Sequence, residues 1–427
     1  MRILIVGATG LIGSTLAARL AAEGYEIAGV ARRPTPTFHP MTWASIDVAQ
    51  ATDPGAWAPC LNDVDAVVNC AGTLQDTPSD STEGVHVLGI AALYEACSRA
   101  GVRRVIHFSA IGAERSATAF SSSKLRGEQE LQARDLQWTV LRPSVVIGRS
   151  AYGGSALIRG LAALPVLPVM PDTAEIQPIH LDDVVETVVK LLRPDAPSCQ
   201  VLELVGPNRY GFDDLVGMFR RWLRRPAAYS LRLPQWAAGA LYRAGDAAAA
   251  LGWKPPIRTT AQSEMRFGAT GDASAWQRAM SIAARPIEQE LAREPASVQE
   301  RWFARMYLLK PLIFGVFGAF WIVTGLISLG PGWEIGAGYV REGGLGPTMA
   351  AAATVAGALA DIVIGAAILY RPTARYGLYA AFLISIAYAV IGTILVPRLW
   401  IDPLGPMLKI WPIIVLNLAA LAILDDR

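Results

Sequence analysis

Charged residues are scarce in this sequence. Aspartate, glutamate, lysine and arginine make up only 17% of its 427 residues, whereas hydrophobic residues make up 52%. Such an apolar composition is unusual for a soluble protein, and the length allows two or three domains. The positive and negative side chains nearly cancel, leaving a formal net charge of +2. This balance argues against a nucleic-acid-binding protein and against an acidic tail.

Cysteine and histidine are also rare, with four residues of each. The cysteines are scattered and form no C-x-x-C pair, so we expect neither a disulfide framework nor a zinc site, and a reducing compartment fits this usage. The histidines lack metal-ligand spacing, and we expect no metal site. We also expect no signal peptide, because the opening residues "MRILIVGATG" are typical of a strand that leads into a turn.

Long apolar runs dominate the sequence after Lys310. Four runs carry almost no charge, and they cover residues 311–330, 349–370, 376–397 and 407–424. A helix needs about 20 apolar residues to cross the hydrocarbon core of a bilayer. The sequence therefore predicts four transmembrane helices, the last of them short and with a lysine near its start. Four such runs in succession disfavour the alternative, which is a set of buried helices in a soluble core.

The basic residues around these runs predict an orientation. Arg301, Arg305 and Lys310 precede the first run, and Arg371 and Arg375 lie between the second and the third. Lysine and arginine are enriched on the cytoplasmic side of membrane helices. We therefore expect the N-terminal domain and the C-terminus to lie in the cytoplasm, at a bacterial-type inner (plasma) membrane.

The first residues of the chain contain a glycine pattern. Gly7, Gly10 and Gly13 have G-x-x-G-x-x-G spacing between a Val/Ile-rich segment and a helical pattern. In that context glycines allow a tight turn, an approach of backbone N–H groups to a pyrophosphate, and close packing of helix on sheet. Further strand-like segments alternate with helix-like ones through residue 148. The fold class predicted is α/β, with a doubly wound parallel sheet, followed by an all-α membrane domain.

The second strand-like segment ends in "VARRPTP" and has no acidic residue. In NAD-preferring sites, an acid about 20 residues after the glycines accepts a hydrogen bond from the ribose 2′-OH. Arg32 and Arg33 stand there instead, and paired guanidinium groups suit the 2′-phosphate of NADPH. The sequence therefore favours NADP(H), with NAD(H) possible; a solvated basic turn is the alternative reading.

Several motifs occur in a single order along residues 1–225: "GATGLIG", "NCAG", "FSAIG", the lysine of "FSSSK", "LRPSVVIG" and "IQPIHLDDVVETVVKLL". In these motifs the chain resembles the short-chain dehydrogenase/reductase superfamily. The likeness is to its extended and atypical branches, which include nucleotide-sugar epimerases and the nucleotide-binding accessory subunit of respiratory complex I. Residues 306–427 are similar to the DoxX-like membrane family, with an acid in the second span and "GPMLK" opening the fourth. We therefore expect a Rossmann domain over 1–225, a substrate cap with connecting helices over 226–300, and a DoxX-like membrane domain over 301–427.

The resemblance also implies a cofactor site. It places a dinucleotide over the glycine turn, with Asp47 near the adenine, Ala71 and Gly72 near the ribose, and the nicotinamide at the end of the "LRPS" segment. The cofactor-binding residues indicated in these ways are Gly7, Thr9, Gly10, Leu11, Ile12, Gly13, Arg32, Arg33, Asp47, Ala71, Gly72, Lys124, Pro143 and Ser144.

The catalytic residues implied by the resemblance are incomplete. The family uses a tyrosine as general acid/base, a lysine four residues later that lowers the pKa of the tyrosine, and a serine that holds the substrate carbonyl. Ser109 and Lys124 match two of these positions, but Phe120 stands where the tyrosine is expected. General acid/base catalysis contributes typically 10²–10⁴-fold. His180 is a weaker candidate for a replacement, since its counterpart in the family lies in a structural turn.

Three functions remain open. The first is a membrane-tethered NADPH oxidoreductase that acts on a lipophilic carbonyl or quinone. The second is a non-catalytic NADPH-binding sensor, or a stabilising subunit of a membrane complex, which Phe120 favours. A nucleotide-sugar epimerase or dehydratase ranks last, since it depends even more on the tyrosine. The partners expected are the lipid bilayer, a lipophilic small molecule and a membrane-complex partner, with no nucleic acid.

One acidic residue, Asp361, lies inside a predicted span. An ionisable group at this depth usually faces a protein interior or a polar cavity. Gly357 and Gly365 lie on the same helix face and allow a second helix to approach. We expect Asp361 to point into the helix bundle and to bond a neighbouring helix through Asn417 or Thr324; a proton-handling or headgroup-binding role is the alternative.

Overall fold

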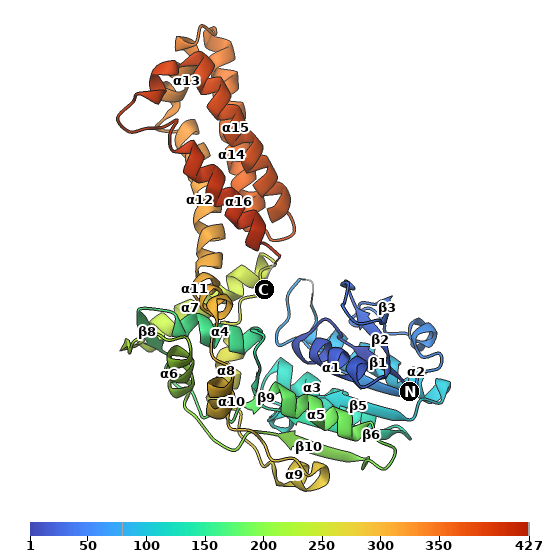
Figure 1. Ribbon diagram of the computed structural model, residues 1–427. Helices are drawn as coiled ribbons and strands as arrows, with labels where there is room; N and C mark the ends of the chain where they lie inside the picture. Colours follow the sequence, from blue (N-terminus) through green and yellow to red (C-terminus); the bar gives the residue numbers. More distant parts are fainter. Residues whose placement is uncertain (79, 426–427) are drawn as a thin grey trace. The chain divides into compact units, whose positions relative to one another are not determined.

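The computed structural model describes residues 1–78 and 80–425, and its chain forms two compact units (Figure 1). The first unit contains Met1–Ala249 and Lys254–Ala304. The second contains Ala250–Trp253 and the chain from Arg305 onward. Each unit is described by itself below.

A seven-stranded parallel sheet forms the centre of the first unit, in the order β10-β6-β5-β4-β1-β2-β3. Its strands are β1 (Arg2–Val6), β2 (Glu26–Ala31), β3 (Thr42–Ser45), β4 (Ala66–Asn69), β5 (Arg104–Phe108), β6 (Gln137–Pro143) and β10 (Gln200–Leu204). The central strands are continuous apolar runs, as is usual for a parallel sheet that is covered on both faces. The order reverses at β1, so the sheet is doubly wound and the predicted fold class is confirmed.

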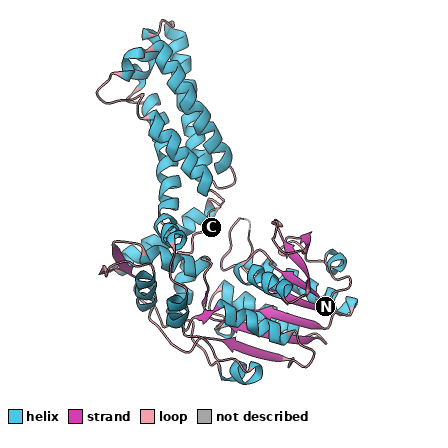
Figure 2. Ribbon diagram, in the orientation of Figure 1, coloured by secondary structure: helices cyan, strands magenta, loops and turns pink. Residues whose placement is uncertain are grey.

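Helices cover both faces of this sheet (Figure 2). Leu16 of α1 (Leu11–Ala22) and Val188 of α5 (Leu181–Leu191) belong to the apolar core on one face. Leu93 of α2 (Gly89–Ala100) and Leu131 of α3 (Ala119–Gln132) belong to the core on the other face. Because the glycine turn follows the last residue of β1, it lies at the carboxyl edge of the sheet, where parallel sheets bind ligands.

The remaining strands and α-helices of the first unit follow β6, and the last of them, α11, extends past Ala304, where this unit ends. They are β7 (Val146–Ile147), α4 (Gly153–Ala162), β8 (Val166–Val169), β9 (Ile179–His180), α6 (Phe212–Trp222), β11 (Tyr229–Arg232), α7 (Gln235–Ala250), α8 (Thr259–Phe267), α9 (Ser274–Met280), α10 (Ile287–Arg293) and α11 (Val298–Tyr307).

A buried arginine, Arg159, holds α4 against α6. The guanidinium of Arg159 lies over the rings of Phe219 and Trp222, at 5.0 and 5.5 Å from their centres, and donates to the carbonyl of Gly148 at 2.7 Å. Cation–π contacts and charge-assisted hydrogen bonds offset the cost of burying this charge.

The second unit is helical. It contains α12 (Leu309–Leu329), α13 (Trp333–Glu342), α14 (Pro347–Leu369), α15 (Ala374–Leu395) and α16 (Ile410–Ile423). Three of these helices, α12, α14 and α15, are long and apolar enough to cross a membrane. The run predicted as a fourth span, 407–424, contains the shorter apolar helix α16, which has 14 residues, or about 21 Å of helix, against a hydrocarbon core of about 30 Å, so the fourth span stays a prediction. The chain before it turns at Gly405, whose φ is +58°, and contains two prolines.

Small residues bring α12 and α14 close together. A Cβ added to Gly325 would lie 2.4 Å from the carbonyl oxygen of Ala358, and one added to Gly365 would lie 2.5 Å from that of Gly318. Larger side chains at these glycines would separate the helices. This contact is the kind by which helices associate in lipid.

Asp361 of α14 is buried in the bundle, as expected, but its partner differs from the prediction. Tyr388 of α15 donates its hydroxyl to Asp361 Oδ1 at 2.9 Å. Asn417 donates instead to the carbonyl of Leu378, and Thr324 to the carbonyl of Phe320 on its own helix. The two predicted partners are therefore wrong. A hydroxyl in a helix readily bonds the carbonyl four residues back, and the sequence does not reveal that competition.

One end of the bundle gathers three segments. The Lys310 ammonium, at the start of α12, donates to the carbonyl of Leu424 at 3.3 Å. Arg371, in the turn between α14 and α15, donates to the same carbonyl at 3.1 Å. The start of α12, this turn and the end of α16 thus lie at the same end of the unit.

Candidate functional site

The turn between β1 and α1 accepts only glycine at two positions. Gly7 has a φ of +78°, and a Cβ there would lie 2.9 Å from the backbone nitrogen of Ala71. A Cβ at Gly13 would lie 2.3 Å from the oxygen of Gly7. Gly7 and Ala8 both donate to the carbonyl of Val30, which ties the turn to the end of β2. The backbone of this turn is therefore fixed and free of side-chain bulk.

The first turn of α1 completes a cradle for an anion. Gly10 is the N-cap, and no side chain caps the helix. The N–H groups of Leu11, Ile12 and Gly13 have no acceptor within the helix, and the positive end of the helix dipole lies here. Thr9 beside them is exposed. These residues fit a pyrophosphate, and the turn is shaped for the dinucleotide that the sequence predicts.

A buried polar cluster shapes the next turn, after β4. The side-chain amide of Asn69 lies 3.3 Å from the hydroxyl of Tyr94 and 3.1 Å from Nδ1 of His107. Its oxygen accepts from the backbone N–H of Ala71 at 3.1 Å. The cluster therefore holds Ala71 and Gly72 at the carboxyl edge, beside the glycine turn.

Lys124 is buried at this edge. Its ammonium donates to the carbonyl of Phe108, the last residue of β5, at 2.9 Å, and a Cβ added to Gly72 would lie 3.2 Å from the same nitrogen. Burial lowers the pKa of Lys124 to about 8, although the carboxylate of Glu128 acts in the opposite direction. Glu128 is itself held by two hydrogen bonds from Arg142, at 2.9 and 2.7 Å. An ammonium with this pKa can release a proton near neutral pH.

Ser109 follows Phe108 directly and has an unpaired hydroxyl. Its backbone N–H donates to Leu141, but its Oγ is buried and has no hydrogen-bond partner within the described residues. Buried polar groups are nearly always paired, so an unpaired one calls for an explanation such as a missing ligand. Ser109 therefore directly follows the residue whose carbonyl binds the Lys124 ammonium, and both the hydroxyl and the ammonium retain hydrogens that could be donated.

Phe120 lies one helical turn before Lys124 on α3, beside a histidine. Its ring meets that of His86 edge-on, with the centres 5.8 Å apart. The backbone N–H of Thr73 donates to His86 Nε2 at 3.0 Å, so Nε2 carries no proton and Nδ1 bonds Ser123 at 2.8 Å. Burial lowers the pKa of His86 well below its ordinary value. This neutral imidazole is a structural neighbour of Phe120 and not a source of protons.

Other predicted residues lie at the same edge but have structural partners. Ser144 follows β6 and donates its hydroxyl to the carbonyl of Ala269 at 2.7 Å, and buried Pro143 precedes it. Asp47 accepts from the backbone N–H of Ala49 at 3.1 Å. His180 accepts from the N–H of Asp182 and caps α5, as the predicted structural role requires.

The two arginines after β2 differ in their partners. Arg32 forms an ion pair with Asp80 at 2.6 Å, and Lys254 pairs with the same carboxylate. Arg33 is exposed, and no ion pair of its side chain occurs among residues 1–78 and 80–425. Asp80 and His86 are the neighbours that the sequence analysis missed. Asp80 reaches Arg32 only through the fold, and His86 lies in a helical segment with no motif around it.

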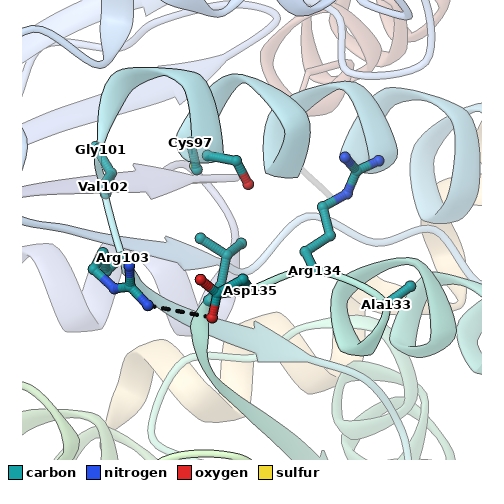
Figure 3. Close-up of a pocket in the computed structure, with 9 residues that line it drawn as sticks. Cys97, Gly101, Val102, Arg103, Ala133, Arg134 and Asp135 are labelled. Atoms are coloured by element: carbon teal, nitrogen blue, oxygen red, sulfur yellow. Dashed lines mark hydrogen bonds and ion pairs between the residues drawn. The ribbon is translucent and has the colours of Figure 1, made fainter.

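Two surface pockets are lined by other residues. One, of about 410 Å³, lies between Cys97, Gly101 and the segment 133–136, where Arg103 and Asp135 pair at 3.3 Å (Figure 3). It borders the amino ends of β5 and β6, at the edge of the sheet opposite the glycine turn. Another, of about 480 Å³, is lined by Asp172 and Arg266 among others, and these two also pair. Within the part of the chain that the structure describes, no group of histidines, cysteines and acids could hold a metal ion.

Two family models match different parts of the chain. Residues 3–201 match the NAD dependent epimerase/dehydratase family, and residues 318–418 match the DoxX-like family. The chain thus joins a Rossmann domain that is similar to the first family to a helical region that is similar to the second. Together with the three long apolar helices, the second match makes this a membrane protein.

Known proteins resemble the first of these domains. A ceramide reductase of Caulobacter vibrioides is 28% identical over 49% of this chain and 66% of its own length. The mitochondrial NADH-ubiquinone oxidoreductase 40 kDa subunit of Neurospora crassa is 29% identical over 37% of this chain and 41% of its own length. The alignments therefore cover less than two thirds of each relative. MoeE5, solved with UDP-glucuronic acid and NAD, has a TM-score of 0.53 at 22% identity over 68% of this chain and 97% of its own, which shows a shared fold.

Proposed function

We propose that this protein is a membrane-anchored NAD(P)H-dependent reductase of a lipophilic carbonyl compound. The observation that carries the proposal is the unpaired, buried hydroxyl of Ser109, which directly follows the residue whose carbonyl binds the Lys124 ammonium. A substrate carbonyl at this place would accept the hydrogen bond that Ser109 lacks. Preorganised donors of this kind stabilise the negative charge that develops on oxygen during reduction.

The cofactor would lie along the carboxyl edge of the sheet. The glycine turn and the first N–H groups of α1 would hold its pyrophosphate, Asp47 would lie near the adenine, Ala71 and Gly72 near the ribose, and Pro143 and Ser144 near the nicotinamide. A bound reduced nicotinamide supplies the hydride. Arg32 and Arg33 favour NADPH over NADH, since guanidinium groups suit a 2′-phosphate.

Lys124 would supply the proton. Three other titratable groups interact with Lys124, namely His86, His107 and Cys70, and all three are unsuited to donate. Burial lowers the pKa of His86 and of His107, which keeps both imidazoles neutral, and burial raises the pKa of the Cys70 thiol. The Lys124 ammonium keeps two hydrogens after bonding Phe108, and its pKa of about 8 lies close to neutral pH, as efficient general acid catalysis requires.

The substrate class follows from the membrane domain and from one relative. A protein anchored in a bilayer meets substrates that dissolve in lipid, and the ceramide reductase that resembles this chain acts on a lipid by its name. We propose a long-chain lipid ketone as the substrate, reduced at the cytoplasmic face of a bacterial inner membrane.

The test is NADPH oxidation by the full-length protein in liposomes that contain a long-chain 3-keto lipid. Ser109→Ala and Lys124→Met should each lower kcat by about 10²-fold, the lower end of the range for general acid catalysis. Ser122→Ala, on the same helix, is the matched control and should change little. Because the proton comes from Lys124, kcat should fall as the pH rises through about 8. Unchanged kcat in both variants would overturn the proposal.

A second function is favoured by Phe120. Without a phenol at this position, the chain could bind the dinucleotide without catalysis, as a sensor or as a stabilising subunit of a membrane complex. The similarity to a subunit of NADH-ubiquinone oxidoreductase supports this candidate. It predicts tight NADPH binding with no turnover of any lipid ketone, and co-purification of a membrane partner whose retention depends on NADPH.

A further inference from the structure

The Arg32–Asp80 ion pair joins the segments that follow β2 and β4. Arg32 follows β2 and Asp80 lies in the loop after β4, and these two strands flank β1 on either side. Neighbouring strands lie about 4.8 Å apart, so β2 and β4 are separated by about 10 Å. The ion pair therefore joins the segments that follow the two neighbours of β1, and β1 itself leads into the glycine turn at Gly7.

Asp80 is held firmly in this place. It is 7% exposed, and its carboxylate accepts the hydroxyl hydrogen of Thr77 at 3.0 Å in addition to pairing with Arg32 and Lys254. Burial alone would raise the pKa of Asp80, but Lys254 and Arg32 lower it overall, so the group is ionised at neutral pH. The cluster of two cations and one anion carries a net charge of +1.

We propose that Asp80 sets the discrimination between NADPH and NADH at this site. The inference rests on the dinucleotide site proposed above. A 2′-phosphate competes with the Asp80 carboxylate for Arg32 and is repelled by it, whereas the 2′-OH of NADH can donate to that carboxylate. Asp80 thus replaces the acidic residue that NAD-preferring sites have after the second strand and that "VARRPTP" lacks. It reduces the preference for NADPH that Arg32 and Arg33 would otherwise produce.

The test is a calorimetric titration of the full-length protein in nanodiscs with NADPH and with NADH. Asp80→Asn keeps the bond from Thr77 and removes the charge. It should tighten NADPH binding about tenfold, equal to about 1.4 kcal/mol, and leave NADH binding unchanged or weaker. Asp76→Asn is the matched control, because Asp76 lies in the same loop, accepts from the N–H of Thr82 and makes no contact with Arg32 among the described residues.

A double-mutant cycle with Arg32→Ala distinguishes a failure of the proposed NADPH preference from a failure of the proposed role of Asp80. In the Arg32→Ala background, Asp80→Asn should change NADPH affinity less than threefold, because the two side chains act through each other. If Arg32→Ala leaves the NADPH to NADH ratio unchanged, the proposed preference itself fails. If Arg32→Ala shifts the ratio but Asp80→Asn does not, or if Asp76→Asn has the same effect, only the role of Asp80 is overturned.

A further variant tests the proposal in case Asp80→Asn does not fold. Lys254→Met removes one of the two cations that pair with Asp80. The ion pair between Asp80 and Arg32 should therefore become stronger. NADPH binding should weaken severalfold while NADH binding stays the same. Equal changes for the two cofactors would count against the proposal.

Discussion

Burying Lys124 makes its charged form costly. The carbonyl of Phe108 is its hydrogen-bond acceptor, and the Glu128 carboxylate one turn away is already bound to Arg142. A carbonyl compensates a buried ammonium less well than a carboxylate in direct contact does, which explains the direction of the pKa shift. The reactive character of this residue comes from the same burial.

The lowered pKa of Lys124 predicts a pH dependence of stability. Between the folded pKa of about 8 and the unfolded value of 10.5, the unfolded chain binds more protons than the folded chain, so stability rises with pH. From pH 7.5 to 9.5 the wild type should gain about 2 kcal/mol relative to Lys124→Met. Urea unfolding of both proteins in nanodiscs at the two pH values measures the difference. A wild type that gains nothing, or loses stability, relative to the variant would show that the ammonium is not desolvated.

Because Phe120 stands where the family has its tyrosine, we expect catalysis to be slow and a tyrosine at this position to raise its rate. With Ser109 and Lys124 in place, Phe120→Tyr adds a phenol whose proton Lys124 can help to release, and reduction of lipid ketones should rise by at least tenfold. Phe120→Leu is the control for altered packing against His86 and should not raise the rate. Ordinary turnover in the wild type, unchanged by Phe120→Tyr, would mean that another group delivers the proton.

Asp361 predicts a structural contribution to the bundle. Asp361→Asn keeps an acceptor for Tyr388, so expression and thermal stability should stay close to those of the wild type. Asp361→Leu removes that acceptor and should lower the stability of the second unit by about 1 kcal/mol. Thermal unfolding in detergent, followed by size-exclusion chromatography, compares the two. Loss of activity in Asp361→Asn, with fold and NADPH binding intact, would instead indicate a proton-handling residue.

At the scale of elements, the segment of β1, the glycine turn and α1 contributes both to the core of the first unit and to the proposed dinucleotide site. Gly13→Ala would place a methyl group 2.3 Å from the Gly7 oxygen, so the turn must shift. We expect a stability loss of about 1–3 kcal/mol and at least tenfold weaker NADPH binding. Gly239→Ala, in a helix position with no heavy atom within 4 Å, should stabilise slightly. Fluorescence titration with NADPH and thermal unfolding of both variants would decide; equal effects would mean that the turn is not constrained.

The sequence predicted those elements whose signals are local. The β1 strand, the glycine turn and α1 follow from residues 2–22 alone, and three of the apolar runs form helices within three residues of the expected bounds. The α16 helix is shorter than expected because a glycine turn and prolines precede it, and hydropathy does not register backbone conformation. The Asp80 and Tyr388 contacts join residues 48 and 27 positions apart, so no local pattern reports them.

At the scale of the whole molecule, the chain consists of two units with different surroundings. The first is a Rossmann-type unit, and the second presents apolar residues such as Leu312, Val363 and Ile394 on its exterior. The three-part division at residues 225 and 300 stays a prediction, as does the cytoplasmic orientation.

The most direct test of the account follows deuterium from cofactor to lipid. Proteoliposomes of the full-length protein receive NADPH deuterated at the transferable position of the nicotinamide, together with a long-chain keto lipid, and the lipid is analysed by mass spectrometry. We predict deuterium on the carbinol carbon of the product, at a rate that falls about 10²-fold in Lys124→Met. Tight NADPH binding with no deuterium in the lipid, in the wild type and in Phe120→Tyr alike, would contradict the assignment as a reductase.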